Sequence, residues 1–426
     1  MGMGMPIPPE FDLIGVGFGP SNLALAIAVA EHNAAAADPV TAHFLEKQPR
    51  FGWHRGMLLE DATMQVSFLK DLVTMRNPAS EFSFLSYLHS RGRLVDFINH
   101  KNLFPLRIEF HDYFEWAAAK VGDQVTYGQE VVSVGDGFEV RTAGGSVYRA
   151  RNLVLGTGLR PNIPEGFTTS DRVWHNHELL HRIGDVHDPE RCVVIGAGQS
   201  AAEVTAFLHE RFPEAEVCSV FARYGYSPSD DSPFANRIFD PEGVDAFYQA
   251  PEDVKRRLMS YHANTNYSAV DIDLIDDLYR RLYSEKVRGV RRLRILNTSR
   301  PIEVTPDGRV TLESLTTGDK SVLEADLVVY ATGYRPADPA PLLGELGERC
   351  RRDDEGRLRV ERDYRLVTPG LAGNIYLQGG TEHTHGVTSS LLSNTAVRVG
   401  EILGSITGGR GSTVDWPSVF SVKEWA

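Results

Sequence analysis

Two glycine-rich turns in the sequence have the spacing of nucleotide-binding sites. They are GVGFGPSNLALA and VVIGAGQSAAE, and their turn glycines are Gly15, Gly17, Gly19, Gly196 and Gly198. Glycines in such a turn let a pyrophosphate approach the backbone, and its negative charge then lies at the amino end of the following helix. Pro20 stands where the usual pattern has a glycine or an alanine, and a first helical turn accepts it because no amide donor is needed there. The sequence therefore predicts two bound nucleotides.

The residues at the end of each second strand distinguish the two nucleotides. Glu46 ends the run VTAHFLE, and a carboxylate at this place accepts hydrogen bonds from a ribose diol, as in FAD or NAD sites. The second module has no carboxylate at the matching place but has Arg223, in VFARYG, which suits a ribose 2′-phosphate. We therefore expect FAD in the first site and NADPH in the second. The alternative for Arg223 is a solvated surface arginine.

Two repeated units of strand, turn and helix are needed to position these residues. A buried strand FDLIGVG, a helix from Pro20 to about Glu31 and a strand VTAHFLEK form the first unit, and CVVIGAGQSAAEVTAFLHERFPEAEVCSVFAR repeats the order. The strand in ADLVVYATGYRP closes the second unit, and NIYLQGGTEHTHGVTSSLLSNTAVRVGEIL returns a strand, a turn and a helix to the first. The sequence thus predicts an α/β fold with two Rossmann-like dinucleotide-binding domains.

The remaining segments complete the predicted domain organisation. QVTYGQEVVSVGDGFEVRTAGGSVYRARNLVLGTG alternates strands with glycine-rich hairpin turns. The segment from about Ser229 to Asp277 lacks the strand–helix rhythm and is predicted to be a small, mostly helical, substrate-binding insertion. We expect the FAD domain at residues 8–165 and 330–426, the NADPH domain at 166–228 and 278–329, and the insertion at 229–277.

Composition and charge limit the class of partner. The chain has 426 residues, enough for two or three domains, of which 42% are apolar and 24% charged. Its formal charge of -13 repels phosphate backbones and anionic membranes, so neither nucleic acid nor membrane is expected as a partner. Cys192, Cys218 and Cys350 form no CxxC pair, which excludes disulfide reduction and favours oxygen activation. With no secretory signal or membrane span expected, the predicted location is the cytoplasm.

Further motifs give the sequence a family resemblance from near residue 11 to near residue 405. They are GVGFGPSNLALA, FGWHRGMLLEDATMQVSFLKDLVTMRNPASEFSFLSYL, FPLRIEFHDYFEWAA, SPFANRIFDPE, NTNYSAVD, ATGYRP and HTHGVTSSLLS. With this ordered set the sequence resembles the N-hydroxylating flavin monooxygenases, the ornithine and lysine side-chain N-hydroxylases of siderophore and hydroxamate pathways. SFLKDL, TNYS and SLLS are closer to the ornithine branch. The resemblance implies FAD, NADPH and molecular oxygen as reactants and L-ornithine as the substrate.

The resemblance also assigns site residues. Residues that would contact the flavin include Trp53, His54 and Gln65, and the implied catalytic residues are Gln65 and Asn266. The amino-acid-binding positions are Lys70, Asn236, Asn266 and Ser393. Lys70 would supply a cation for the substrate α-carboxylate, and the asparagines can donate and accept at once. The alternative role of Lys70 is an ion pair with Asp71. The alternative role of Asn236 and Asn266 is to cap loops. The predicted cofactor-binding set comprises Gly15, Gly17, Gly19, Pro20, Glu46, Lys47, Trp53, His54, Gln65, Leu391, Gly196, Gly198, Gln199, Ser200, Arg223, Thr332 and Gly333.

The implied reaction uses both cofactors and needs no protein nucleophile. NADPH would reduce FAD, oxygen would add to the reduced ring, and the resulting hydroperoxide would deliver its distal oxygen to the terminal amine of ornithine. The protein must exclude water from this centre, and retained NADP⁺ would form part of the cover. A helix after His385 and Gly386 is expected to point its positive end at the reduced flavin. The resemblance suggests a homotetramer.

Other functions are open on the sequence alone. They are an L-lysine or aliphatic diamine N-hydroxylase, a sulfide- or ketone-oxidising flavin monooxygenase, and a non-catalytic flavin-binding sensor. GVTSSLLS, which ends at Ser393, departs from the many ornithine enzymes that carry an aspartate before LLS. HNH at 175–177 and HTH at 383–385 have no cysteine or carboxylate at ligand spacing, so no metal is expected. Asp230 and Asp231 are expected to cap a loop and not to act as paired acids.

Overall fold

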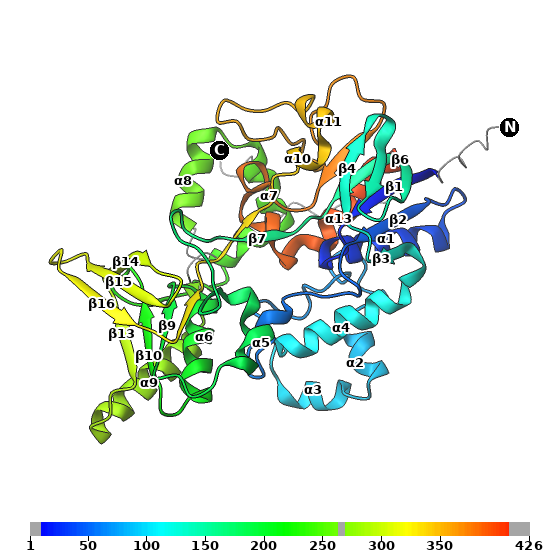
Figure 1. Ribbon diagram of the computed structural model, residues 1–426. Helices are drawn as coiled ribbons and strands as arrows, with labels where there is room; N and C mark the ends of the chain where they lie inside the picture. The colour runs from blue at the N-terminus through cyan, green and yellow to red at the C-terminus, as the bar shows by residue number, and fades with distance from the viewer. Residues whose placement is uncertain (1–9, 263–268, 409–426) are drawn as a thin grey trace, which may run out of the picture.

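The computed structural model describes residues 10–262 and 269–408, which form two lobes, each built round a mainly parallel β-sheet (Figure 1). Blue, cyan and orange elements make up one lobe, and green and yellow elements make up most of the other. The chain therefore leaves the first lobe, builds the second and returns to the first. This course is the one expected from the two repeated units of the sequence.

The first sheet has the strand order β3-β2-β1-β6-β5-β4, and β19 pairs with β6. Its strands are β1 (Glu10–Val16), β2 (Ala42–Glu46), β3 (Val125–Tyr127), β4 (Val131–Gly135), β5 (Glu139–Thr142), β6 (Val147–Leu155) and β19 (Asn374–Leu377). Because β1 is parallel to β2 and β6, and β19 is parallel to β6, their carboxyl ends meet at one edge. The strand order changes direction at β1, which is where a doubly wound sheet binds its ligand.

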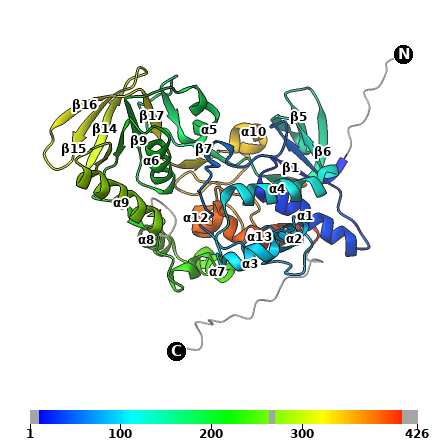
Figure 2. The same cartoon turned by 90° about the horizontal axis from the view of Figure 1, so that it is seen from below.

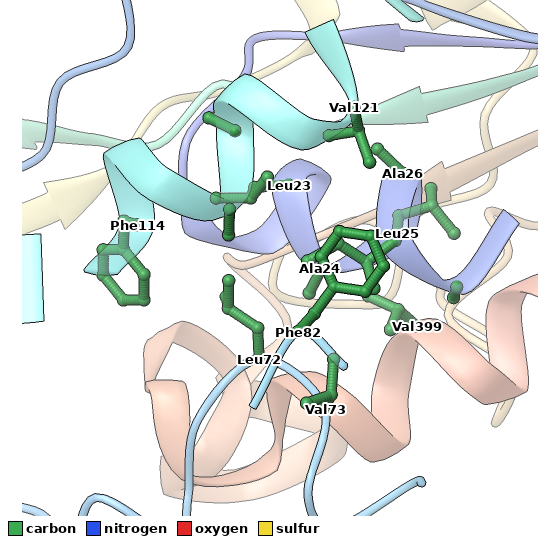
Figure 3. Packing of buried hydrophobic residues seen from close by; sticks show 14 of the residues in the cluster. Leu23, Ala24, Leu25, Ala26, Leu72, Val73, Phe82, Phe114, Val121 and Val399 are labelled. Carbon is green, nitrogen blue, oxygen red and sulfur yellow. The ribbon is translucent and has the colours of Figure 1, made fainter. Parts of the chain in front are cut away.

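Helices from three parts of the chain cover this sheet. They are α1 (Pro20–Ala35), α2 (Phe84–Ser90), α3 (Leu94–His100), α4 (Arg107–Lys120), α10 (Ala340–Leu343), α11 (Glu345–Glu348), α12 (Glu382–His385) and α13 (Thr395–Ile406). The predicted first helix is confirmed and extends beyond Glu31. Figure 3 shows Leu23 and Leu25 of α1 packed among Phe82, Phe114 of α4 and Val399 of α13, all of them buried. This apolar cluster fixes the amino end of α1 against the sheet.

The second sheet has the order β13-β10-β9-β17-β8, with every pair parallel. Its strands are β8 (Val173–His175), β9 (Arg191–Ile195), β10 (Glu216–Val220), β13 (Leu293–Leu296) and β17 (Leu327–Tyr330). The short helix α5 (Leu179–Arg182) follows β8, and α6 (Gln199–Arg211) joins β9 to β10. A three-stranded antiparallel sheet of β14 (Ser299–Val304), β15 (Arg309–Ser314) and β16 (Lys320–Glu324) lies between β13 and β17 in the chain. Both predicted Rossmann-like units are confirmed.

Two short strands carry the chain between the lobes. β7 (Leu159–Pro161) follows β6, β18 (Tyr334–Pro336) follows β17, and the two pair antiparallel with Tyr334 opposite Pro161. Each crossing strand begins within a few residues of the carboxyl end of a sheet strand. The pairing therefore holds the carboxyl edges of the two sheets close together, so that ligands bound at both edges can meet.

The segment between β10 and β13 is mostly helical, as expected. Its elements are β11 (Ser227–Pro228), the 3-10 turn η6 (Ala235–Phe239), α7 (Pro241–Gln249), α8 (Glu252–His262), β12 (Ala269–Val270) and α9 (Ile272–Arg288). Figure 2 shows α7 and α8 on one side of α12, and α7 packs against α12. The helix α9 continues well past Asp277 and packs on α6. Among residues 10–262 and 269–408, no helix is long and apolar enough to cross a membrane.

Candidate active site

The first glycine turn leaves the amino end of α1 open. Gly17 has a φ of +83°, and a Cβ there would lie 2.5 Å from the carbonyl oxygen of Gly156, so only glycine fits where β1 and β6 end. Gly19 precedes α1 with no side-chain cap, Pro20 begins the helix, and its first turn holds no acidic residue. A Cβ on Gly19 would meet no atom within 4 Å. The uncapped amides and the free space beside them suit a pyrophosphate.

Glu46 lies at the same sheet edge, at the end of β2. Its side chain is buried, Oε2 accepts a hydrogen bond from the Phe18 amide at 2.6 Å, and Oε1 accepts one from the Gln48 amide at 2.8 Å. Each carboxylate oxygen has a further lone pair for a hydroxyl donor, as a ribose diol requires. Lys47 is exposed next to it. Gly15 lies inside β1, where any Cβ would collide with the Phe44 ring, so it serves the packing of the sheet.

Several buried polar atoms have no hydrogen-bond partner in the described part of the chain. Among them are Oε1 of Gln378, directly after β19, and Oγ of Ser390 and both amide atoms of Asn394, on the turns before α13. Gln378 follows β19 and donates its Nε2 to Asn22 Oδ1 of α1 at 2.8 Å, which places it at the first glycine turn. Buried polar groups normally have partners. The N–H and C=O groups of an isoalloxazine ring are of the right kind, so the residues present fit FAD.

The helix expected after His385 and Gly386 begins nine residues further on, at Thr395. The chain instead makes two 3-10 turns, η8 (Gly386–Ser390) and η9 (Leu392–Asn394), and α13 begins only after them. Hydroxyl groups compete for the backbone in this segment, since Thr388 Oγ1 donates to the carbonyl of His385 at 3.3 Å. The helix end available to a flavin in this segment is therefore the amino end of α13, next to the buried Ser393. Leu391 lies half-buried between the two turns.

The second glycine turn leaves the amino end of α6 open in the same way. Gly196 has a φ of +149°, and a Cβ there would collide with the carbonyl oxygen of Ala331, where β9 and β17 end. Gly198 precedes α6 without a side-chain cap, and Gln199 and Ser200 begin a first turn that holds no acidic residue. The α6 end therefore has the same features as the α1 end and suits a second pyrophosphate.

The other residues predicted for the second nucleotide lie along the same edge. Arg223 is exposed just after β10, where its Nη1 donates to Ser227 Oγ at 3.3 Å. Thr332 and Gly333 follow β17, and the Gly333 carbonyl accepts a hydrogen bond from His175 Nε2 at 2.9 Å. Arg223 is thus placed to meet a phosphate, whereas Thr332 and Gly333 shape the crossing from β17 to β18.

Trp53 and His54 lie on the long loop that follows β2. The half-buried Trp53 ring packs edge to face on Phe114 of α4, with centroids 5.2 Å apart. His54 has a φ of +49°, a conformation that non-glycine residues rarely adopt. Its ring lies 5.9 Å from that of Tyr334 on β18. The loop predicted to contact the flavin is therefore held against the crossing strand between the two lobes.

Lys70 lies on a neighbouring stretch of this loop and is half-buried. Its Nζ is 5.6 Å from the centroid of the Phe239 ring, at the end of η6. Burial lowers the pKa of Lys70, and the negative charge of Asp240 acts in the opposite direction. A partly desolvated ammonium group gains more from an added carboxylate than one in water, which is the property expected of a substrate clamp.

The ion pair between Lys70 and Asp71, the alternative role of Lys70, is absent from the described residues. Asp71 is buried and accepts hydrogen bonds from the backbone amides of Val73 at 3.0 Å, Thr74 at 2.7 Å and Phe84 at 2.7 Å. The Asp71 carboxylate therefore organises the turn, and the Lys70 ammonium lies on the η6 side.

One other predicted substrate residue lies on η6, the turn whose Phe239 ring faces Lys70. Asn236 lies on η6, and its Nδ2 donates to the carbonyl of Asp231 at 2.6 Å, which is the loop contact weighed as its alternative role. η6 packs against η8, which leads to Ser393. Asn266 lies outside the described residues. Asp230 caps the same loop, as expected, since its Oδ1 accepts from the Ser232 amide at 3.1 Å.

The two histidine-rich motifs have buried rings. Burial lowers the pKa of His175 to about 4 and that of His385 to about 3, so both rings are neutral at working pH. His175 donates to the Gly333 carbonyl, and the His385 ring stacks on Tyr364 with centroids 4.1 Å apart. Within the described ranges, no three His, Cys, Asp or Glu side chains are grouped so that they could hold a metal ion. The histidines of both motifs therefore make buried contacts that support the fold.

Comparisons with known proteins agree with this arrangement. Residues 9–336 match the family described as L-lysine 6-monooxygenase/L-ornithine 5-monooxygenase. The L-ornithine N(5)-monooxygenase of Burkholderia cepacia is 44% identical, over 96% of this chain and 97% of that protein. The chain belongs to this family. The resemblance stated from the motifs is confirmed.

Solved structures of family members match over almost the whole chain. An ornithine N-hydroxylase from Kutzneria sp. 744, named as a complex with reduced FAD, NADP⁺ and L-ornithine, is 47% identical with a TM-score of 0.90. That alignment covers 94% of this chain and 99% of the other. The ornithine hydroxylase of Pseudomonas aeruginosa is 37% identical with a TM-score of 0.86, at the same coverage of 94% and 99%. The predicted fold class is thereby confirmed as the one found in this family.

In this monooxygenase-family chain, Gln65 and Gln199 were predicted as site residues, but Arg107, Glu203 and Asp271, which join them across the two nucleotide sites, were not. Arg107, which begins α4, donates from Nη2 to Glu203 Oε1 of α6 at 2.7 Å and from Nη1 to Oε2 at 3.0 Å. Glu203 Oε1 also accepts from Gln199 Nε2 at 3.0 Å. Gln199 Oε1 accepts from the Asp271 amide at 2.8 Å, and Asp271 Oδ2 accepts from Gln65 Nε2 at 3.4 Å. The only sequence signal was the position of Arg107 and Asp271 inside family motifs.

Proposed function

We propose that this chain is an FAD- and NADPH-dependent monooxygenase that hydroxylates the terminal side-chain amine of L-ornithine. The observation that carries the proposal is the chain of hydrogen bonds from Gln65 through Asp271 to Gln199, which joins the flavin-side loop to the NADPH-side helix. Lys70 lies five positions after Gln65 and offers a half-buried cation at this junction. Ornithine is favoured among substrates because the relative and the two structures described above, at 37% to 47% identity, are ornithine enzymes, whereas the lysine and cadaverine enzymes of similar coverage are 32% and 26% identical.

The two open helix ends have separate tasks in this proposal. Gly17, Gly19 and Glu46 at the first sheet hold the pyrophosphate and ribose of FAD, and the amino end of α6 with Arg223 holds NADPH. Bound FAD, reduced by NADPH, supplies the activated oxygen atom. We divide the chain into an FAD domain, residues 8–165 and 330–426, an NADPH domain, 166–228 and 278–329, and a substrate insertion, 229–277. The insertion carries Asn236 and, with Lys70, encloses the amino acid.

The protein contributes binding, orientation and exclusion of water. Lys70 fixes the α-carboxylate of the substrate, so the distance from this anchor to the flavin selects the chain length. The terminal amine must be neutral to react, and a pKa near 10.4 makes its deprotonation at pH 7 cost roughly 4.6 kcal/mol. A water-poor cavity disfavours the cationic amine and reduces this cost without a catalytic base.

A product assay across a panel of amines tests the function. Purified holoenzyme is given NADPH and either L-ornithine, L-lysine or putrescine, and hydroxylamine formed per NADPH oxidised is measured. We expect the highest yield with ornithine and wasteful NADPH oxidation with the other two. The highest yield with lysine or putrescine would move the assignment to those substrates. No hydroxylamine with any amine, together with no stimulated NADPH oxidation, would favour a flavin-binding sensor.

The pH dependence of the same reaction tests the neutral-amine requirement. Because deprotonation of the substrate precedes reaction, we expect the single-turnover rate of hydroxylation to rise from pH 6 to pH 9. A flat profile over this range, under conditions where the hydroxylation step limits the rate, would contradict the requirement.

We further propose a cytoplasmic homotetramer whose product enters hydroxamate or siderophore assembly. All three cysteines are buried free thiols, as suits a reducing compartment. Light scattering of the purified holoenzyme gives the mass of the assembly, and a value of one or two chains would refute the tetramer.

A further inference from the structure

Asp271 contacts residues of both predicted cofactor sites. It ends the motif NTNYSAVD and lies directly after β12 (Ala269–Val270), whose two side chains are buried. Its backbone N–H donates to Gln199 Oε1 at 2.8 Å, and its Oδ2 accepts from Gln65 Nε2 at 3.4 Å. Gln199 begins the helix proposed to hold NADPH, and Gln65 is the residue proposed beside the flavin. One aspartate therefore links the two sites directly.

The position of Asp271 is fixed by its cap of α9 and by the pairing of β12. Its Oδ1 accepts from the Asp273 amide at 2.9 Å and so caps α9. β12 is paired with β11 through Ala269 opposite Ser227 and Val270 opposite Pro228. With Oδ1 committed to the cap, Oδ2 is the oxygen that faces Gln65. The carboxylate therefore presents a fixed acceptor to the Gln65 amide.

Gln199 is equally fixed on its own helix. Its Nε2 donates to Glu203 Oε1 at 3.0 Å, one turn further along α6, so its Oε1 is the atom left to face Asp271. Glu203 is held by both terminal nitrogens of Arg107. A displacement of the first turn of α6 therefore displaces Gln199 and, through the Asp271 amide, the acceptor of Gln65.

We propose that Asp271 is a positioning residue. It sets the orientation of Gln65 according to whether a ligand is bound at the amino end of α6. The inference rests on the proposed function, in that NADP⁺ is taken as the ligand of this helix end. With NADP⁺ bound there, the first turn of α6 is held in place, the Gln199 to Asp271 contact holds the carboxylate, and the carboxylate holds Gln65 on the flavin side of the junction. The amide side chain then excludes water from the reacting centre.

Two substitutions separate this role from the capping role. Asp271→Ser keeps the cap of α9, because a serine hydroxyl accepts from the same amide, but it is too short to reach Gln65. Asp271→Asn keeps the cap through Oδ1 and places an amide nitrogen opposite Gln65, whose own amide can rotate to present its oxygen. Asp271→Asn is therefore the matched control. Both variants are expected to fold, with thermal midpoints close to that of the unsubstituted protein.

The first measurement is the change in flavin absorbance when NADP⁺ is added to the oxidised holoenzyme. We expect Asp271→Ser to reduce the amplitude of this difference spectrum by about threefold or more, with the Kd of NADP⁺ changed less than about twofold. The second is hydroxylamine formed per NADPH with ornithine, which should fall by a similar factor. Asp271→Asn should restore both, and Asp271→Ser should add nothing to Gln65→Ala.

The inference is overturned if Asp271→Ser leaves either quantity unchanged, or if Asp271→Asn is as impaired as Asp271→Ser. A loss in the double variant larger than that of Gln65→Ala alone would also overturn it. The difference spectrum requires no hydroxylated product. If the unsubstituted protein made no hydroxylamine, the proposed function would fail, while the spectrum would still decide the role of Asp271.

Discussion

The ion pair between Arg107 and Glu203 should make a large contribution to stability at the junction between the lobes. Arg107 lies on α4 of the first lobe and Glu203 on α6 of the second, with side-chain exposures of 13% and 6% and a closest N–O distance of 2.7 Å. Arg107 also donates to the carbonyls of Met57 at 3.1 Å and Thr63 at 3.4 Å. Replacing Arg107 by methionine leaves the Glu203 carboxylate buried without its cation. The cost of removing one partner of such a pair is about 3 to 5 kcal/mol.

This free energy translates into a measurable shift of the thermal midpoint. With an unfolding entropy of about 2.1 cal/mol/K per residue, a loss of about 3 to 5 kcal/mol lowers the midpoint of a chain this long by about 3 to 6 °C. The double variant Arg107→Met/Glu203→Met removes both charges and should recover most of the loss, since apolar residues can replace a buried pair at little cost. The midpoint is followed by FAD fluorescence and circular dichroism at one fixed FAD concentration.

A surface pair provides the matched control. Arg257 and Asp253 lie 3.7 Å apart with side-chain exposures of 76% and 65%, so Arg257→Met should change the midpoint by less than about 1 °C. A midpoint shift in Arg107→Met as small as that of Arg257→Met would refute the role given to the buried pair. So would a double variant whose loss equals the sum of the two single losses, because charges that interact cannot be additive.

Three further substitutions test the ligand contacts and the buried histidine. Lys70→Met should raise the KM for ornithine by roughly tenfold or more while leaving the KM for NADPH unchanged, as steady-state kinetics will show. Arg223→Ala should raise the KM for NADPH by about tenfold without affecting NADH, and equal effects on both would refute a 2′-phosphate contact. Burial lowers the pKa of His385 from 6.5 to about 3, so the unfolded chain binds the extra proton and stability falls as pH drops below 6.5. In urea unfolding, the free energy of unfolding lost between pH 7.5 and pH 5 should be about 2 kcal/mol smaller in His385→Gln than in the unsubstituted protein.

Local chemistry was sufficient to predict the two nucleotide units. The runs that became β1, α1 and β2, and likewise β9, α6 and β10, carry their own signals: apolar strands, glycine turns and an uncapped helix start. Glu46 and Arg223 could be placed at the sheet edges because strand ends are fixed by sequence order in such a unit. None of these predictions needed knowledge of distant contacts.

Two details near the candidate site depend on competition among short polar side chains. The helix expected after Gly386 begins only at Thr395. Hydroxyl contacts to the backbone, such as that of Thr388, stabilise 3-10 turns there instead. Lys70 and Asp71 are adjacent in sequence and could pair. The Asp71 carboxylate is instead buried, and it accepts hydrogen bonds from the backbone amide and the hydroxyl of Thr74. The sequence Asp-x-x-Thr was the signal that could have indicated this.

The junction of the two lobes could not have been predicted from any single motif. The contact of Gln199 with Glu203 follows from helical spacing, but Arg107 and Asp271 reach the same helix turn only because α4, α6 and β12 pack at the junction. Each glycine motif specifies how one nucleotide binds. The distance and angle between the two nucleotides are instead set by these contacts between segments. A hydride donor and a flavin react well only when they are held to within about 0.5 Å of the productive geometry. The residues that hold α6 against the flavin-side loop are therefore expected to affect the coupling of NADPH oxidation to hydroxylation as strongly as the residues that touch the substrate.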